Sequence, residues 1–183
     1  MSEQIESVGV EVKWEGKVIR AGIERFRYAD GAEVTRDKVW HPGAVGILAL
    51  DDDHVWLTRQ PREVVEAPAS LEIPAGKLDV PGESPLETAK RELAEEIGKR
   101  AERWEELVAF YTSPGFSDER VWVYVATELS DDAASSADDD ERIEIVPWPL
   151  GRLDDAIDQC EDAKSLIALL WLAGQRQVAY GMA

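Results

Sequence analysis

The sequence predicts an α/β sandwich, in which a mixed sheet lies between helices, together with a small antiparallel β-sheet at the N-terminal end. Three observations predict this fold: three β-rich runs fill residues 8–40, more such runs flank one clearly marked helix at 85–97, and two helical stretches follow residue 152. A doubly wound sheet would instead show short βα units in regular alternation. The 183 residues suffice for one sizeable core and an appendage. We expect residues 1–41 to form the β-meander and residues 42–183 the main domain.

The N-terminal meander is predicted by β-rich runs at residues 8–14, 17–26 and 34–40. Glu15-Gly16 and the stretch 28–31 supply turn residues between them. Three short strands cannot bury a core of their own. We therefore expect the meander to pack on another surface, either of its own domain or of a partner chain.

The main domain begins with Ala44–Leu50, an apolar run of strand length that predicts a strand buried on both faces. Residues 55–58 are expected to pair with it across a turn at 51–54. Beyond the marked helix, residues 105–112, 121–127 and 143–146 predict further strands. Two helices are expected after Arg152, and Gly174 is expected to end the second.

The marked helix has recognisable start and stop residues. Ser84 can cap the first turn, Pro85 suits the first helical position, and Glu87 completes a capping box. Apolar residues recur at helical spacing along one face, and Gly98 stands where a left-handed terminal residue is needed. The apolar stripe comprises Leu86, Ala89, Leu93 and Ile97.

The opposite face of this helix is acidic. Glu92, Glu95 and Glu96 lie within one turn, so their carboxylates repel one another. A divalent cation would relieve that repulsion, and Mg²⁺ prefers such oxygen ligands together with substrate phosphate. Arg91 can reach Glu87 and Glu95, one turn either way. A solvated acidic face with no metal is the alternative that the residues alone leave open.

Composition limits the classes of partner. A formal net charge of −18 argues against nucleic-acid binding, although a cation and a few local arginines could still hold a small anionic substrate. No apolar run approaches the length of a membrane span, and Met1 to Glu11 contains acids where a signal peptide would be apolar. The single cysteine, Cys160, is expected to be a small buried hydrophobe. These features favour a cytoplasmic protein that does not bind membranes.

The loop and helix around residue 90 resemble a known family. Gly76, Glu83 and the run from Arg91 to Gly98 resemble the Nudix box of hydrolases that split nucleoside diphosphates linked to another group. The box usually has five residues between its first glycine and first glutamate. Here six residues, 77–82, separate Gly76 from Glu83, which lengthens the loop but keeps the helix register.

Other segments resemble the ADP-ribose pyrophosphatase branch of that family. They include His41 to Val45, Arg59-Gln60, Leu71 to Gly76 and Thr112 to Phe116. In that branch a proline about sixteen residues after the box distinguishes ADP-ribose hydrolases, and Pro114 stands sixteen residues after Gly98. A proline beside a glycine is also an ordinary turn former.

The resemblance implies hydrolysis of ADP-ribose to AMP and ribose 5-phosphate with Mg²⁺, or Mn²⁺ in its place, as the cofactor. It implies metal ligands at Glu92, Glu96 and the Ala75 carbonyl, with Glu95 and Glu83 as further ligands or supporting groups. Arg91 and Glu95 are expected to assist catalysis. The substrate is expected to contact Arg59, Arg62, Glu72, Phe26, Tyr28, Pro114 and Gly115, with adenine stacking on an aromatic ring.

The general base is expected outside the helix, whose glutamates would be occupied by metal. Enzymes of this kind supply it from a loop before the last strand, and Glu141 is our choice in the acidic stretch 138–144. Glu144 alternates with two isoleucines, so we expect it to be a solvent-facing strand residue. An acidic run that only aids solubility is the alternative.

The resemblance also implies a homodimer with exchanged N-terminal sheets, which would explain a meander too small to fold alone. Two rival functions remain at this point. One is a Nudix hydrolase of another nucleotide or nucleoside diphosphate sugar. The other is a non-catalytic ADP-ribose sensor, which would not need three crowded carboxylates.

Overall fold

A computed structural model describes residues 4–132 and 142–179 of the chain. Within them the chain forms two compact units. The first contains residues 4–43 and 110–120, and the second contains residues 44–109 together with the described residues from 121 onward.

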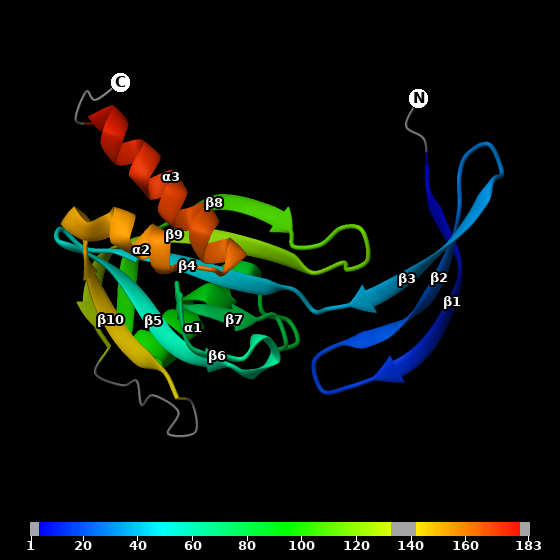
Figure 1. Ribbon diagram of the computed structural model, residues 1–183, viewed down its shortest axis with the longest axis horizontal. Helices are drawn as coiled ribbons and strands as arrows, with labels where there is room; N and C mark the ends of the chain where they lie inside the picture. Colours follow the sequence, from blue (N-terminus) through cyan, green and yellow to red (C-terminus); the bar gives the residue numbers. More distant parts are fainter. Residues whose placement is uncertain (1–3, 133–141, 180–183) are drawn as a thin grey trace. The chain divides into compact units, whose positions relative to one another are not determined.

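The first unit is built on a three-stranded antiparallel sheet in the order β1-β2-β3 (Figure 1). The strands are β1 (Glu6–Glu15), β2 (Arg20–Arg27) and β3 (Glu33–Trp40). Gly31 adopts a φ of +86° in the turn between β2 and β3, a conformation that glycine accepts at little cost. The predicted meander is therefore confirmed.

Residues 110–120 pack with this small sheet, which the boundary expected near residue 41 did not foresee. The Val39 amide donates to the Phe116 carbonyl at 2.8 Å, and the Asp118 amide donates to the Val39 carbonyl at 3.2 Å. The Asp118 carboxylate also accepts a 2.9 Å hydrogen bond from the His41 amide. These bonds join segments more than seventy residues apart in the sequence.

The second unit contains a seven-stranded mixed sheet with the path β10-β5-β4-β9-β8, in which β6 pairs with β5 and β7 pairs with β4. Strands β4 and β9 run parallel, whereas β4 pairs antiparallel with β5 and β7. The strands are β4 (Ala44–Leu50), β5 (His54–Arg62), β6 (Ala67–Glu72), β7 (Ala75–Lys77), β8 (Lys99–Tyr111), β9 (Arg120–Asp131) and β10 (Glu144–Pro149). The three-residue strand β7 was not predicted.

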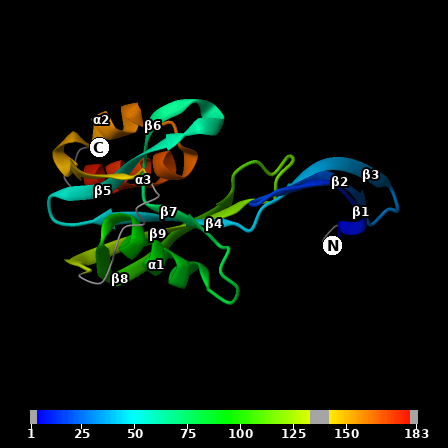
Figure 2. The same ribbon diagram turned by 90° about the horizontal axis from the view of Figure 1, so that it is seen from below.

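Helices cover both faces of this sheet (Figure 2). Helix α1 (Pro85–Ile97) lies on one face, and α2 (Leu153–Gln159) and α3 (Ala163–Ala179) lie on the other. Short 3₁₀ turns, η1 (Glu63–Val65) and η2 (Leu150–Arg152), complete the unit. The predicted sandwich of a mixed sheet between helices is confirmed.

The core under α1 follows from the alternation of side chains along β4. The buried residues Val45, Ile47 and Ala49 pack against the apolar stripe of α1, of which Leu93 and Ala89 are fully buried. Burial of such aliphatic side chains contributes about 1.5 to 3 kcal/mol each. This packing fixes the polar face of α1 relative to the strands.

The predicted end of the last helix at Gly174 is wrong, since α3 continues to Ala179. A glycine within a helix costs only about 1 kcal/mol relative to alanine, and the surrounding packing can offset that cost. No helix within the described residues is long and apolar enough to cross a membrane.

Candidate active site

Helix α1 begins and ends as its sequence predicts. The Ser84 hydroxyl accepts from the Glu87 amide at 3.3 Å, and the Glu87 carboxylate accepts from the Ser84 amide at 2.8 Å. Gly98 ends the helix with a φ of +64°. These contacts fix which turn of the helix presents each glutamate.

Arg91 gathers three carboxylates from the helix and from the loop before it. Its Nη1 donates to Glu92 Oε1 at 2.8 Å and to Glu95 Oε2 at 2.7 Å, while its Nε donates to Glu83 Oε1 at 3.1 Å. The expected contact with Glu95 forms. Glu87, the other expected partner, instead completes the capping box, and Glu83 takes its place.

The electrostatics of this cluster favour its charged forms. Partial burial would lower the pKa of Arg91, but its hydrogen bonds to Glu83, Glu95 and Glu92 outweigh burial and raise it. The hydrogen bond from Arg91 in turn lowers the pKa of the Glu83 carboxyl. Arg91 and Glu83 are therefore both ionised at neutral pH.

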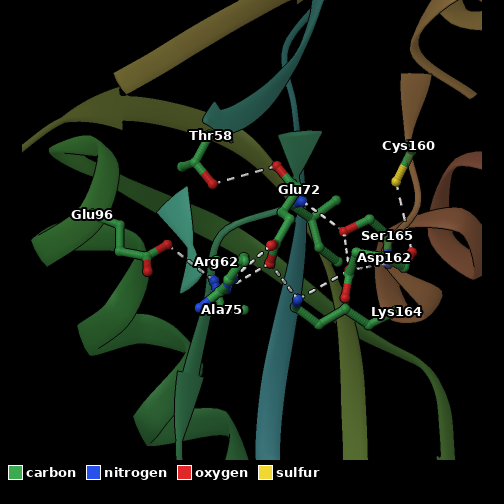
Figure 3. Close-up of polar contacts among 10 residues, drawn as sticks. Thr58, Arg62, Glu72, Ala75, Glu96, Cys160, Asp162, Lys164 and Ser165 are labelled. Atoms are coloured by element: carbon green, nitrogen blue, oxygen red, sulfur yellow. Dashed lines mark hydrogen bonds and ion pairs between the residues drawn. The ribbon is translucent and has the colours of Figure 1, made fainter. Parts of the chain in front are cut away.

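Glu96 turns to the segment before the loop rather than to Arg91. Its side chain is buried, and its Oε2 accepts a 3.0 Å hydrogen bond from the Ala75 amide (Figure 3). The next residue, Gly76, lies against Glu92: a Cβ atom added to it would stand 2.0 Å from Glu92 Cδ. Only glycine permits this approach, which explains why the loop has a glycine here.

The hydrogen bond at Ala75 and the close approach at Gly76 thus bring Ala75, Glu92 and Glu96 together. Among the described residues no three Asp, Glu, His or Cys side chains form a ready-made metal cluster, and Arg91 binds carboxylate oxygens of Glu92 and Glu95. The donor set is carboxylate and backbone oxygen, which suits a hard divalent cation such as Mg²⁺. The residues fit such an ion if carboxylates turn away from Arg91.

A second charged cluster surrounds Glu72 on the α3 side of the sheet (Figure 3). Arg62 Nε and Nη2 donate to the two oxygens of Glu72 at 2.7 and 2.6 Å, and Lys164 Nζ donates to Oε2 at 2.7 Å. Burial would raise the pKa of Glu72, but the hydrogen bonds from Arg62 and the charge of Lys164 outweigh it and lower the pKa to about 2. Through its two hydrogen bonds Glu72 holds Arg62 in place. Because Glu72 is only 2% exposed, it has little surface left for a ligand.

The other residues predicted to contact the substrate are divided between the two units. Arg59 Nη2 donates to Gln159 Oε1 at 3.0 Å. Phe26, Pro114 and Gly115 line one pocket of about 270 Å³ within the first unit, beside Tyr111, Phe116 and other residues of β3 and the segment 111–118. Tyr28 does not line that pocket and lies at the turn after β2. The binding roles of these residues stay predictions.

Of Glu141, the predicted base, and Glu144, its alternative, the structure describes only Glu144. Glu141 lies outside the described residues. Glu144 is exposed at the start of β10, opposite Arg59 of β5. The expectation that Glu144 is a solvent-facing strand residue is confirmed.

Sequence reasoning missed Asp162, Lys164 and Ser165 at the start of α3. The Ser165 hydroxyl accepts a 2.9 Å hydrogen bond from the Ile73 amide, and both Lys164 and Ser165 contact the Asp162 carboxylate. Ile73 and Ser165 are 92 positions apart in the sequence. No local spacing pattern could have joined them.

The family model described as the NUDIX domain matches residues 40–169, which include the loop, helix α1 and the start of α3. The chain belongs to the Nudix family. The match begins just before β4, so most of the small N-terminal sheet precedes the Nudix domain.

Curated relatives of this Nudix chain extend over most of its length. It is 39% identical over 173 residues to an ADP-ribose pyrophosphatase of Bacillus subtilis (strain 168), covering 91% of each chain. It is 34% identical over 181 residues to a methanol dehydrogenase activator of Bacillus methanolicus, covering 95% of each. Among solved structures, it resembles that of an ADP compounds hydrolase with a TM-score of 0.78 and 27% identity, covering 96% of this chain and 98% of the other.

Proposed function

We propose that this protein hydrolyses the diphosphate of ADP-ribose, giving AMP and ribose 5-phosphate, with Mg²⁺ as its cofactor and Mn²⁺ as a substitute. The observation that carries the proposal is the convergence of the Nudix loop and α1, where Glu96 binds the Ala75 amide and Glu92 lies against Gly76. The names of the ADP-ribose pyrophosphatase and ADP compounds hydrolase relatives support the choice of substrate.

Glu92, Glu96 and the Ala75 carbonyl are the groups that would hold the metal, with Glu83 and Glu95 as further ligands or supports. When bound, such ions polarise the diphosphate and lower the pKa of a coordinated water. Arg91 keeps the carboxylates oriented and balances part of their charge, as its three ion pairs indicate.

Arg62 is proposed to bind the anionic part of the substrate. Two of its nitrogens are fixed by Glu72, while its side chain remains 42% exposed, so its orientation is set without closing it to solvent. A fixed guanidinium loses less conformational entropy on binding phosphate than a free one. Arg59 is proposed to assist it.

The pocket lined by Phe26, Pro114 and Gly115 is proposed to take the adenine. Its walls include the rings of Phe26, Tyr111 and Phe116, which offer apolar faces for stacking. Glu141 remains our proposed general base.

We also propose a cytoplasmic homodimer that forms through the N-terminal sheet. Val10, Val12 and Trp14 of β1 are 57%, 42% and 55% exposed, which leaves an apolar edge strand uncovered in a single chain. Exposed apolar strands of this kind are commonly covered by pairing. The single, buried and unpaired cysteine agrees with a reducing compartment.

A substrate panel tests the proposed reaction. ADP-ribose, other ADP-sugars, a UDP-sugar and NAD would be compared at equal concentrations with Mg²⁺, and kcat/KM is expected to be highest for ADP-ribose. A clear preference for a UDP-sugar or NAD would assign another Nudix substrate. Tight binding of ADP-ribose without release of AMP would favour the sensor.

A further inference from the structure

The first turn of α3 contacts the candidate site through Lys164. Its Nζ lies 2.7 Å from Glu72 Oε2 and 2.9 Å from Asp162 Oδ2 (Figure 3). The side chains of Lys164 and Glu72 are only 13% and 2% exposed. An ion pair shielded in this way is weakly screened, so it constrains the Glu72 carboxylate strongly.

Glu72 passes this constraint on to Arg62. The same Oε2 that accepts from Lys164 accepts from Arg62 Nη2, and Oε1 accepts from Arg62 Nε. Because the two-point contact depends on the carboxylate plane, any rotation of Glu72 would also turn the guanidinium. Lys164 therefore fixes the direction of Arg62 through the Glu72 carboxylate oxygen that both side chains bind.

The neighbouring residue, Ser165, holds a different segment. Its buried hydroxyl accepts the Ile73 amide hydrogen bond at 2.9 Å. Two residues further along, the Ala75 amide is bound by Glu96, and the Pro74 carbonyl between them accepts from β4. The segment from Ile73 to Ala75 is thus held from the α3 side by Ser165 and from the α1 side by Glu96.

Close packing supports this arrangement at Gly46 of β4. A Cβ atom added there would stand 2.9 Å from Ile73 Cδ1 and 3.7 Å from Lys164 Cδ. The side chains of Ile73 and Lys164 therefore both lie beside Gly46, and a larger residue at position 46 would press on Ile73.

We infer that Lys164 and Ser165 are positioning residues, Lys164 for the substrate-binding Arg62 and Ser165 for the metal-binding segment at Ala75. This inference rests on the proposed function, which gives Arg62 and Ala75 those roles. In this account both α3 residues act through Arg62 and the Ala75 segment, not by contact with substrate or metal. If Lys164 and Ser165 had merely structural roles, a change at either would weaken substrate binding and metal binding together. If they are positioning residues, a change at Lys164 should weaken substrate binding alone, and a change at Ser165 should weaken metal binding alone.

The Lys164 branch is tested by calorimetric titration of ADP-ribose in EDTA, where neither metal nor turnover contributes. Lys164→Met should weaken ADP-ribose binding about tenfold, in the range typical of lost supporting contacts, and Lys164→Arg should restore most of it. Lys90→Met, which removes an exposed lysine of α1, should leave ADP-ribose binding unchanged.

A double variant tests whether Lys164 acts through Arg62. In an Arg62→Met background, Lys164→Met should cause no further loss of ADP-ribose binding, because both changes act through one group. Full additivity of the two losses would overturn the inference.

The Ser165 branch is tested by titrating Mn²⁺ and following its spin-resonance signal. Ser165→Ala should weaken Mn²⁺ binding about tenfold and leave ADP-ribose binding in EDTA unchanged, and Lys164→Met should show the reverse pattern. Equal weakening of both ligands in both variants, or no change in either, would overturn the inference. If Ser165→Ala fails to fold in a thermal melt, Ser165→Cys, which keeps the volume but accepts a hydrogen bond only weakly, takes its place in the same two titrations.

The same preparations keep this inference separate from the proposed reaction. Wild-type protein that binds ADP-ribose and Mn²⁺ but releases no AMP would refute the reaction, while the crossed binding pattern would still support the positioning roles. If wild-type protein hydrolyses ADP-ribose but both variants lose binding of both ligands, the positioning roles alone would be refuted.

Discussion

Glu92 and Glu96 stand one turn apart on α1 but have different surroundings. Glu92 is paired with Arg91 at 2.8 Å, whereas Glu96 is buried and bound to the Ala75 amide at 3.0 Å. A metal ion would draw on both, since each has an oxygen close to the Ala75–Gly76 backbone. Their roles can be separated from fold stability, because glutamine has nearly the same shape and still accepts a hydrogen bond.

Glu92→Gln and Glu96→Gln should each lower kcat at saturating Mg²⁺ by at least about 100-fold, because removal of a ligand charge weakens metal-assisted hydrolysis. Circular dichroism and thermal melting should show an intact fold. Glu87→Gln serves as the matched control on the same helix, since glutamine also completes a capping box. Near wild-type turnover in either test variant would remove that carboxylate from the metal site.

Glu72 should make stability depend on pH. Its folded pKa of about 2 lies below its ordinary value of 4.5, so its contribution is complete above 4.5 and is lost as pH falls from there towards 2. The shift corresponds to about 3 kcal/mol of unfolding free energy. The stability difference between wild type and Glu72→Gln, measured by urea unfolding, should therefore shrink between pH 6 and pH 3. A difference that stays constant over that range would show that the Glu72 charge is not stabilised by Arg62 and Lys164.

At the scale of elements, α1 is the best defined part of the site because its limits are encoded locally. The capping box at Ser84 and the left-handed Gly98 set its length, and the buried stripe sets its rotation. A helix so defined presents its glutamates in a fixed order to the segment at Ala75.

Ser84→Ala should lower the free energy of unfolding by about 1 kcal/mol, because it removes the side-chain acceptor of the first turn. Denaturant titration measures the loss, and Ser84→Asp, which keeps an acceptor, should restore most of it. The kcat of both variants should match wild type below the melting range. A Ser84→Ala protein as stable as wild type would mean that the cap is not needed to hold the helix.

The elements that could be predicted are those with local patterns. The meander strands, β4 and α1 follow from residue periodicity and turn residues within their own segments. The strand β7 could not be predicted, since it has only three residues and its pairing with β4 depends on tertiary contacts. The extension of α3 past Gly174 depends likewise on packing, which can override a glycine's low helix propensity.

The same distinction holds for the site. The glutamates of α1 lie within one turn, so sequence spacing alone could bring them together. The contacts of Lys164 with Glu72 and of Ser165 with Ile73 span 92 positions and have no pattern in the sequence. The pairing of residues 116–118 with Val39 was missed for the same reason.

At the scale of the whole molecule, a net charge of −18 repels an anionic substrate. Local cations must therefore do the binding. Arg59 and Arg62 of β5 are the cations that we propose for this role, and a divalent ion at the Nudix box would be another. The acidic surface elsewhere favours solubility and disfavours nucleic acid.

The protein should be a dimer in solution, because pairing with a second chain would bury the exposed apolar residues of β1. Light scattering at micromolar concentration should give the mass of two chains, and Val10→Asp combined with Val12→Asp should shift it to one. Val178→Asp, at a valine of α3 that is more exposed than either of them, should leave the mass unchanged. A fully active wild-type monomer would rule out both the exchanged sheet and a site shared between subunits.

Product analysis after incubation with ADP-ribose and Mg²⁺ tests the central claim most directly. Separation of the products by anion-exchange chromatography should show AMP and ribose 5-phosphate in equal amounts, and excess EDTA should abolish both, because the Nudix glutamates act through a divalent ion. The claim would be contradicted if folded, metal-saturated protein released no AMP from ADP-ribose, or released it equally well in EDTA.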